Sequence, residues 1–223
     1  MHFHWGRLRR NRRMFASHFR VSDVPQSEGD ALIWLYQHTT GPNWTNKTNW
    51  LVTPTVANWF GVTVTLGHVT SVVLPANGLA GNISAFPVHN LPAITSLRFE
   101  SNASLSGDAS GWTIPATMQY LYFHTTGMSG TPDINGNTAM RTYLWLNCGL
   151  NQANVDSILL SVYNRRMAFT FGVPALNVGG TNVAPSGVYQ AACPPTTGKE
   201  YAFELVTDSC GDGFIKWAVT FTP

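Results

Sequence analysis

The sequence has few charged residues. Asp, Glu, Lys and Arg make up 11% of its 223 residues, whereas average globular proteins contain about 25%. Gly, Asn, Ser and Thr are abundant instead, which favours strands and tight turns over exposed charged helices. Hydrophobic residues reach 44% and aromatic residues 12%, enough for the core of one globular domain. We therefore expect a folded chain rich in strands.

Long apolar runs are also missing. No stretch approaches the roughly 18 consecutive apolar residues that a transmembrane helix needs, so we expect no membrane span. The first 20 residues, MHFHWGRLRRNRRMFASHFR, are basic, but neither an apolar core nor a small-residue cleavage site follows them. This composition argues against a secretory signal and leaves a mitochondrial presequence open.

Signatures of catalysis and metal binding are absent as well. The chain has no G-x-S-x-G, no G-x-x-x-x-G-K-S/T, no H-E-x-x-H and no paired C-x-x-C. Only His2 and His4 share a short histidine spacing, and two ligands cannot complete a tetrahedral site. The stretch DSCGDG (208–213) lacks the remaining ligands of a calcium loop. We expect a protein that is not an enzyme, with no catalytic residue, no metal site and no cofactor.

The charges that are present are unevenly distributed. Residues 1–20 hold six arginines and no acid, so they carry +6 and the remaining residues −4, within a total of +2. Such a segment is either a solvated tail or an anchoring arm. Interleaved apolar side chains favour docking on an acidic protein surface over pure phosphate binding, although nucleic acid stays an alternative. We assign 1–22 to a basic arm, anchored by Trp5, Arg7, Arg9, Arg10, Arg12, Arg13 and Phe15.

An apolar pattern occurs four times in the chain, first in the stretch VTSVVLPANGLAGNI, which begins at Val69. Its polar column reads Asn77, Asn102, Thr126 and Cys148, with steps of 25, 24 and 22 residues. Alternate residues of a strand point to opposite faces, so one pair in each copy should point inward. Polar side chains in the column would bond backbone groups left free by the turn. The inward pairs are Val72 with Leu74, Leu97 with Phe99, Leu121 with Phe123, and Tyr143 with Trp145.

This pattern resembles the leucine-rich repeat, L-x-x-L-x-L-x-x-N/C-x-L, of the plant-type, bacterial and phage-encoded kind. The resemblance covers about residues 27–222, with the repeats at 69–150. It implies an α/β fold: a short right-handed leucine-rich repeat solenoid with a curved parallel β-sheet, a helical N-terminal cap and an α/β C-terminal cap.

The flanking segments resemble the caps of that family. ALIWLYQHTTGPNWTNKTNWL and ANWFGV, within an N-terminal cap at 23–68, imply a helix that begins near Ser27 and ends near Gly41. Its tryptophans, Trp44, Trp50 and Trp59, would cover the first repeat.

A last helical repeat and a C-terminal cap are expected at 151–223. Helical spacing of Val155, Ile158, Leu159 and Val162 predicts a helix on the convex side. The resemblance of ALNVGGTNVAPSG to the last strand and turn of such proteins implies a further helix near 199–206 and a strand near 217–222.

The three cysteines have different roles. Cys148 occupies the polar column and should be buried. Cys193 and Cys210 bracket the last expected helix and are candidates for a disulfide, which would staple the C-terminal cap outside a reducing cytosol. Spacing alone does not establish the distance between their Cα atoms, so their bonding stays open.

The resemblance also implies a binding surface, because residues flanking the inward pairs face outward along the concave sheet. The middle repeats place aromatic, basic and leucine side chains side by side, a composition typical of interface hot spots. Apolar exposure without any partner is the alternative. The expected partner-binding residues are Arg98, Glu100, Tyr120, Tyr122, His124, Leu144 and Leu146.

The function implied by the resemblance is non-catalytic recognition or assembly, with protein partners for the solenoid and the arm inside a larger assembly. An extracellular style of cap without an export signal suits a protein released by lysis. We therefore expect a virion component, either capsid-decorating or tail-associated, of a bacterial virus. The alternatives are a bacterial surface or secreted protein that binds protein or glycan, and nucleic-acid binding through the arm.

Overall fold

The structure is a computed structural model that describes residues 19–170 and 174–223. His2, His4 and the expected anchoring residues lie outside the described residues. Those anchoring residues are Trp5, Arg7, Arg9, Arg10, Arg12, Arg13 and Phe15.

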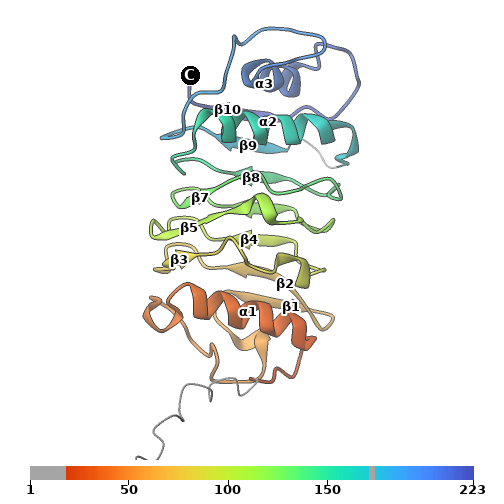
Figure 1. Cartoon of the computed structure of the whole chain (residues 1–223). Coiled ribbons are helices and arrows are strands. Elements are labelled where there is room, and N and C mark those ends of the chain that lie inside the picture. The colour runs from red at the N-terminus through yellow and green to blue at the C-terminus, as the bar shows by residue number, and fades with distance from the viewer. Residues whose placement is uncertain (1–18, 171–173) are drawn as a thin grey trace, which may run out of the picture.

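A seven-stranded sheet runs the length of one side of the molecule, in the order β1-β2-β4-β6-β8-β9-β10 (Figure 1). The first two strands form an antiparallel hairpin, and each later neighbouring pair is parallel. The strands are β1 (Val62–Thr65), β2 (His68–Val73), β4 (Ser96–Arg98), β6 (Tyr120–Tyr122), β8 (Thr142–Leu144), β9 (Ala175–Val178) and β10 (Ala218–Phe221).

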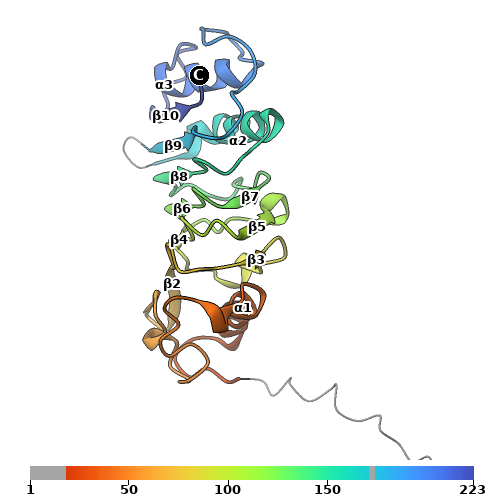
Figure 2. The same ribbon diagram turned by 90° about the vertical axis from the view of Figure 1, so that its left-hand side faces the viewer.

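A second sheet of three parallel strands accompanies the first. It consists of β3 (Gly81–Asn82), β5 (Leu105–Asp108) and β7 (Gly127–Ser129), in that order. The coils that begin with β2, β4 and β6 therefore cross from the seven-stranded sheet to this sheet and back, whereas the coil after β8 contains α2 instead, and the coils stack on one another (Figure 2). The second sheet was not predicted from the sequence, because each of its strands carries at most one buried apolar side chain.

Three α-helices cover the side opposite the seven-stranded sheet or lie at the ends of the stack (Figure 2). They are α1 (Gln26–His38), α2 (Gln152–Arg165) and α3 (Gly198–Thr207). Short 3₁₀ turns complete the coils: η1 (Gly41–Asn43), η2 (Val56–Asn58), η3 (Val88–Asn90), η4 (Ala109–Gly111) and η5 (Arg166–Ala168). No helix within 19–170 or 174–223 has the length and apolar character needed to cross a membrane.

The predicted helix after the repeats is confirmed, since α2 buries Val155, Ile158, Leu159 and Val162. The first helix begins one residue before Ser27, near which it was expected to start, but Ser27 is not its cap. α1 begins at Gln26, directly after Pro25, so Ser27 lies inside the helix instead of capping it. Proline lacks a backbone N–H and clashes with the preceding turn in a helix interior, so it is tolerated only at the start of a helix.

All four inward pairs are confirmed as core, because each of these eight side chains is fully buried. The polar column works as expected at Asn102. Its Oδ1 accepts from the backbone N–H groups of Asn77 and Leu79 at 2.9 and 3.0 Å, and its Nδ2 donates to the carbonyls of Leu74 and Phe99 at 2.9 and 2.8 Å. This one side chain thereby joins two successive coils.

Asn182 continues the polar column after Cys148, although it was not predicted from the sequence. It accepts from the N–H groups of Cys148 and Leu150 and donates to the carbonyls of Trp145 and Val178. It lies 34 residues after Cys148, because α2 lengthens the coil between them. A search at the shorter repeat spacing therefore passes over it.

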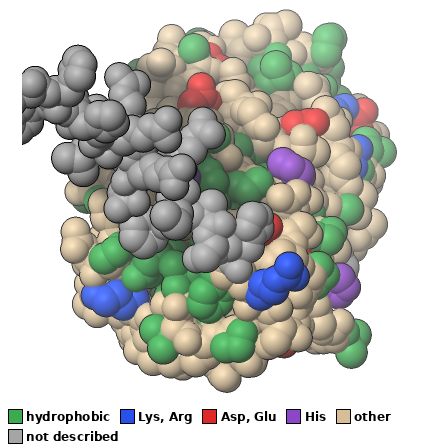
Figure 3. All heavy atoms as spheres, turned by 60° about the horizontal axis from the view of Figure 1, so that its bottom comes forward, with side chains coloured by type: hydrophobic (Ala, Val, Ile, Leu, Met, Phe, Trp, Pro, Cys, Tyr) green, Lys and Arg blue, Asp and Glu red, His purple; other side chains and the backbone are tan. Residues whose placement is uncertain are grey.

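Tryptophans fill the end of the stack at which the chain enters. Trp44, Trp50 and Trp59 are nearly fully buried, and the ring centroids of Trp50 lie 4.9 Å from those of the other two. Each indole N–H donates to a backbone carbonyl. Seen from this end, charged side chains are few and scattered, and hydrophobic side chains reach the surface (Figure 3). Val52 and Leu66 are 77% and 95% exposed.

At the opposite end, a loop that begins after Asn182 leads to α3 and β10. Both elements lie within one residue of the ranges expected from the sequence. The sulfurs of Cys193 and Cys210 are bonded to each other, and their Cα atoms lie 5.6 Å apart. Arg166 at the end of α2 pairs with Asp212. These links tie the loops around α3 to one another and to α2.

Candidate binding surface

The outward face of the seven-stranded sheet carries rows of side chains in register. Ser96, Tyr120 and Thr142 form one row, and Arg98, Tyr122 and Leu144 the next. Backbone hydrogen bonds from Ser101 to His124 and from Thr125 to Leu146 keep the third row aligned beyond the strand ends. Six of the seven predicted partner-binding side chains are partly exposed here. We call this set the sheet-face cluster: Arg98, Tyr120, Tyr122, His124, Leu144 and Leu146.

Tyr122 is the centre of the sheet-face cluster. The guanidinium of Arg98 lies 4.7 Å from its ring centroid, within the range of a cation–π contact. The Tyr120 ring meets it edge-on at 6.3 Å, and the His124 ring lies 6.4 Å away. Such contacts restrict the rotamers of the side chains involved, so less conformational entropy is lost when a partner docks.

Glu100 does not belong to the exposed surface, contrary to expectation. It is 5% exposed, and its Oε1 accepts from Nε and Nη2 of Arg98 at 3.0 and 2.5 Å. The Arg98 side chain is 39% exposed, so it is the member of the pair that a partner can reach. The ion pair draws the carboxylate against the sheet, and Glu100 acts by orienting Arg98.

Asn177 extends the row of Arg98, Tyr122 and Leu144 by one residue, which was not among the predicted partner-binding residues. It lies beside Leu144 in the register of β8 and β9, is partly exposed, and accepts from the N–H of Gly179. The strand itself had been expected from ALNVGGTN. Its place in the row depends on the register between β8 and β9. The sequence pattern did not predict that register, because α2 lies between the two strands.

The carboxylates of the protein are all engaged within its own fold. Each of the 11 acidic residues accepts a hydrogen bond from another described residue, eight of them from backbone N–H groups. The full set is Asp23, Glu28, Asp30, Glu100, Asp108, Asp133, Asp156, Glu200, Glu204, Asp208 and Asp212. The surface therefore offers donors, rings and apolar groups more readily than free acids.

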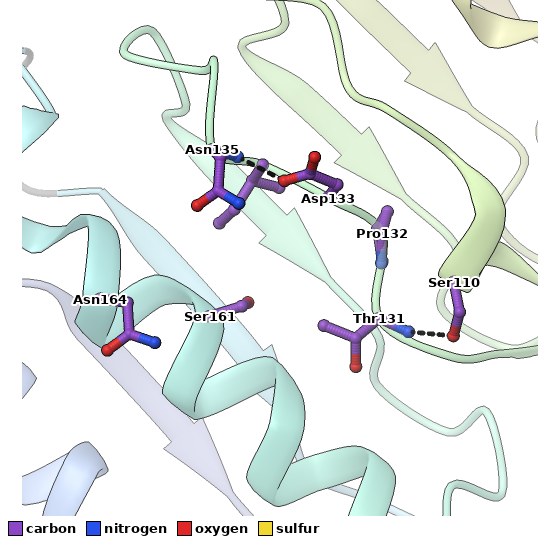
Figure 4. A pocket seen from close by; sticks show the side chains of 8 residues that line it. Ser110, Thr131, Pro132, Asp133, Asn135, Ser161 and Asn164 are labelled. Carbon is purple, nitrogen blue, oxygen red and sulfur yellow. Dashed lines mark hydrogen bonds between the residues drawn. The ribbon is translucent and has the colours of Figure 1, made fainter.

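A polar pocket lies away from the sheet face, between α2 and the coil that carries β7. Ser161 and Asn164 of α2 line a cavity of about 280 Å³ together with Thr131, Asp133 and Asn135 of the neighbouring coil, and the Ser161 hydroxyl points toward Thr131 (Figure 4). Ser110, Pro132 and Ile134 complete its lining. The Asp133 carboxylate accepts from the N–H of Asn135, and the Ser110 hydroxyl accepts from that of Thr131. The pocket thus contains hydroxyl and amide groups but no histidine, cysteine, lysine or arginine.

His68 and Glu28 form the one histidine–carboxylate pair within the described part of the chain, with Nδ1 and Oε1 2.6 Å apart. Glu28 is buried and also accepts from the N–H of Val69. The pair therefore attaches α1 to β2. No serine, threonine or cysteine side chain in 19–170 or 174–223 hydrogen bonds to His68, so no nucleophile accompanies it.

Two groups of side chains around α3 have the spacing to hold a metal ion, but their ligand atoms are already used. Cys193 and Cys210 are bonded to each other, and Glu204 accepts from Ser209 and from the N–H of Cys210. Asp208 accepts from two N–H groups of its own loop. This arrangement organises a turn.

Perturbed pKa values occur away from the sheet-face cluster. Burial raises the pKa of the Tyr143 phenol and of the Cys148 thiol. Hydrogen bonds from Ser110 lower the pKa of Asp108, and those from Thr196 lower the pKa of Glu200. Tyr143 is a core residue, and Cys148, which was expected to be buried, is partly buried against the core. Asp108 and Glu200 accept hydrogen bonds at a turn and at a helix start, so all four shifts have structural causes.

Comparisons with known proteins bear on the fold. No model of a known protein family matches the chain, and no curated protein matches it. Its structure is similar to the leucine-rich repeat ectodomain of the receptor kinase SOBIR1 from Arabidopsis thaliana. The similarity has a TM-score of 0.50 at 15% sequence identity and covers 89% of this chain and 94% of that one. The protein thus has a leucine-rich-repeat-like mixed α/β fold with a parallel sheet.

Proposed function

We propose that the protein is a non-catalytic recognition module that binds a protein partner through the sheet-face cluster. The observation that carries this proposal is the contiguity of the cluster: arginine, two tyrosines, histidine and two leucines lie in adjacent rows and stay partly exposed. Tyrosine and arginine are enriched among the residues that dominate interface energies.

The shape of the surface favours a macromolecule over a small ligand. Neither the polar pocket beside α2 nor the groove beside β10 includes a residue of the sheet-face cluster. Small ligands are usually bound in concave cavities, whereas protein interfaces are broad and have an apolar centre with a polar rim. Leu144 and Leu146 would supply the apolar centre, with Arg98 and His124 at its rim.

The module is proposed to be a right-handed solenoid with a curved sheet, closed by caps at 23–68 and 151–223. Support comes from the buried tryptophans at one end and from α3 at the other, because both cover apolar side chains that the repeats between them would otherwise expose. Terminal units with a different outer face are what a short repeat protein needs in order to stay soluble.

A double variant tests the binding surface. Tyr120→Ser with Tyr122→Ser removes both rings without touching the buried pairs, while Leu66→Ser removes an exposed apolar side chain at the tip of the β1–β2 hairpin as a matched control. A partner isolated on the full-length protein should bind the double variant at least about 100-fold more weakly by calorimetry. It should bind the Leu66→Ser control as it binds the original protein. Equal affinity for the double variant would contradict the proposal.

The larger assembly is proposed to be the particle of a bacterial virus, in which the arm at 1–22 anchors the protein. Composition supports this: the arm is basic, and no catalytic signature was found in the sequence. Fractionation of the native source with peptide mass spectrometry tests the idea. Co-sedimentation with particles at a fixed ratio to a capsid or tail protein is expected. Recovery in the cell-envelope or secreted fraction would instead favour the surface-protein alternative.

Nucleic-acid binding by the arm is a second candidate. The observation that favours it is the charge of the arm, which holds six arginines and no acid within residues 1–20, because such a cluster can neutralise several phosphates. Affinity for a double-stranded oligonucleotide should fall steeply with salt, with a log–log slope of about −4.5 to −5.4 if five or six phosphates are neutralised. Binding that is insensitive to salt would exclude this role.

A further inference from the structure

We propose that the outer edge of β10 is a second interaction site, which accepts an extended acidic segment of another protein as an additional strand. This site lies apart from the sheet-face cluster and does not depend on the function proposed for that cluster. It rests on an open sheet edge, an apolar groove along that edge, and a lysine without a partner.

β10 is the last strand of the sheet, and its outer edge is open only in part: the N–H of Trp217 on that side donates to the carbonyl of Leu205 in α3 at 2.8 Å, whereas Val219 and Phe221 lie beyond this contact. Among the described residues, it pairs with β9 on one side and with no strand on the other. The N–H of Ala218 donates to the carbonyl of Pro174, toward β9. Alternate residues of a parallel strand direct their backbone groups to the same side, so the N–H and C=O groups of Val219 and Phe221 face the free edge. An unpaired row of this kind is a template for strand addition.

A groove of about 520 Å³ follows the same edge. Three consecutive strand residues line it, Val219, Thr220 and Phe221, together with Tyr189, Lys199 and Pro223. The Tyr189 ring packs against Phe221 and against Phe203 of α3, with centroids 5.6 and 5.0 Å apart, yet the residue remains 45% exposed. The groove thus has an aromatic wall that an added strand would cover.

The register indicates which side chains of the added strand would enter the groove. Val219 and Phe221 lie opposite Leu176 and Val178, both buried, so they point to the core side of the sheet. Neighbours across a ladder point the same way, and every second residue of the incoming segment would therefore contact Tyr189, Val219 or Phe221. Apolar residues are expected at those positions.

Lys199 sets the charge preference of the groove. It is partly exposed, and its ammonium has no hydrogen-bond or ion-pair partner within the part of the chain that the structure describes. Lys216, just before β10, is exposed as well. No acidic residue lines the groove. An acidic residue flanking the apolar positions of the incoming segment would complement this charge.

This chemistry argues against the chain's own arm as the occupant. The arm contains six arginines and no acid, so it would place positive charge against Lys199. A second copy pairing edge to edge would bring two Lys199 side chains to one interface, which like-charge repulsion disfavours. An acidic segment of a different protein is therefore the occupant that fits.

Peptide titration followed by NMR amide shifts of the full chain tests the site. The probes are acetyl-Glu-Val-Thr-Val-Thr-Val-Glu-amide and its counterpart with both Glu residues replaced by Lys. We expect the Glu peptide to shift the amides of Val219 and Phe221 and to bind about fivefold more tightly than the Lys peptide. Lys199→Glu should reverse that preference.

Variants at the edge supply the control. Val219→Pro removes an N–H that faces the free edge, a position where proline is tolerated, and should abolish peptide binding. Ala218→Ser alters an exposed residue of the same strand outside the groove and should change nothing. The Tyr120→Ser/Tyr122→Ser variant should bind the peptide normally, which separates this site from the sheet-face cluster.

Four results would overturn the proposal. They are equal binding of the two peptides, shifts confined to the sheet-face cluster, tighter binding by a peptide of residues 1–18, and edge-to-edge dimers that neither peptide dissociates.

Discussion

Individual side chains join the coils of this protein, and the clearest case is Asn102. The side chain is 2% exposed and satisfies backbone groups of two coils. Its position was evident from the sequence because the polar column recurs at regular spacing. The equivalent Asn182 was not, because a helix changes that spacing. Column residues are therefore predictable only where the coil length stays constant.

Replacing Asn102 with leucine should destabilise the protein strongly. The backbone N–H groups of Asn77 and Leu79 and the carbonyls of Leu74 and Phe99 would remain buried without partners. We expect the free energy of unfolding to fall by about 3 kcal/mol or more. Chemical denaturation measures this. Asn58→Ala, at an exposed site, is the control and should change stability by less than about 0.5 kcal/mol. A similar small change for Asn102→Leu would show that the column is dispensable.

Glu200 makes a pH-dependent contribution at the start of α3. Its carboxylate accepts from the N–H groups of Thr196 and Thr197, which lowers its pKa below the ordinary value of 4.5. A lowered folded-state pKa contributes stability above the unfolded value, and that contribution is lost as pH falls through the folded value. The melting temperature of Glu200→Gln should therefore lie below that of the original protein at neutral pH, and the difference should shrink below about pH 4. A difference that is constant with pH would contradict this role.

Glu100 shows that a repeat pattern does not predict whether an outward-facing side chain is exposed, because this residue is only 5% exposed. Alternation correctly places it on the outward face, but exposure depends on what neighbouring side chains do. Arg98 is two residues away on the same face and long enough to cover the carboxylate. The repeat pattern thus predicts the direction of a side chain, and the packing of its neighbours decides whether a partner reaches it.

At the scale of elements, apolar periodicity predicted the helices and strands that bury several apolar side chains at regular spacing. It missed the strands that bury one or none. The four apolar residues of α2 and the strands carrying the inward pairs were found. The second sheet was missed because its strands carry at most one buried apolar side chain each: Leu105 in β5, Met128 in β7 and none in β3. The start of α1 was predicted to within one residue, but Pro25 and not Ser27 occupies the cap position. Short strands and helix ends depend on backbone contacts between coils, which a single sequence does not reveal.

The disulfide should stabilise the element it encloses. Cys193 and Cys210 are 17 residues apart and enclose α3, whose Ala202 and Leu205 are buried. Closing a loop of this length contributes about 3 kcal/mol by restricting the unfolded chain. The Cys193→Ser/Cys210→Ser variant should therefore melt at a lower temperature, monitored by circular dichroism. Reduction of the original protein should reproduce that shift. Unchanged melting in both cases would mean that the cross-link contributes nothing.

At the scale of the whole molecule, the repeat aligns equivalent positions of successive coils and so builds a surface that no single coil contains. Arg98, Tyr122 and Leu144 belong to β4, β6 and β8, and come together only because the strands are in register. The leucine-rich-repeat-like fold explains how the sheet-face cluster forms. Its chemistry comes from the particular residues on the rows, and the partner is to be identified through them.

The two proposed sites lie at different positions along the stack of coils. The sheet-face cluster lies at the middle of the stack, and the open edge of β10 lies at its end, next to α3 (Figure 1). Two surfaces at different positions along one rigid stack would let the protein hold two partners at once. This arrangement suits an assembly component, in which each contact has its own specificity.

Hydrogen–deuterium exchange of the full chain, with and without its isolated partner, tests the central claim most directly. We expect the backbone amides of residues 96–101, 120–125 and 142–147 to exchange more slowly in the complex. Amides around the polar pocket beside α2 should change little. Protection confined to that pocket, to the β1–β2 hairpin or to the edge of β10, with none on these three strands, would contradict the assignment of the sheet-face cluster as the partner-binding surface.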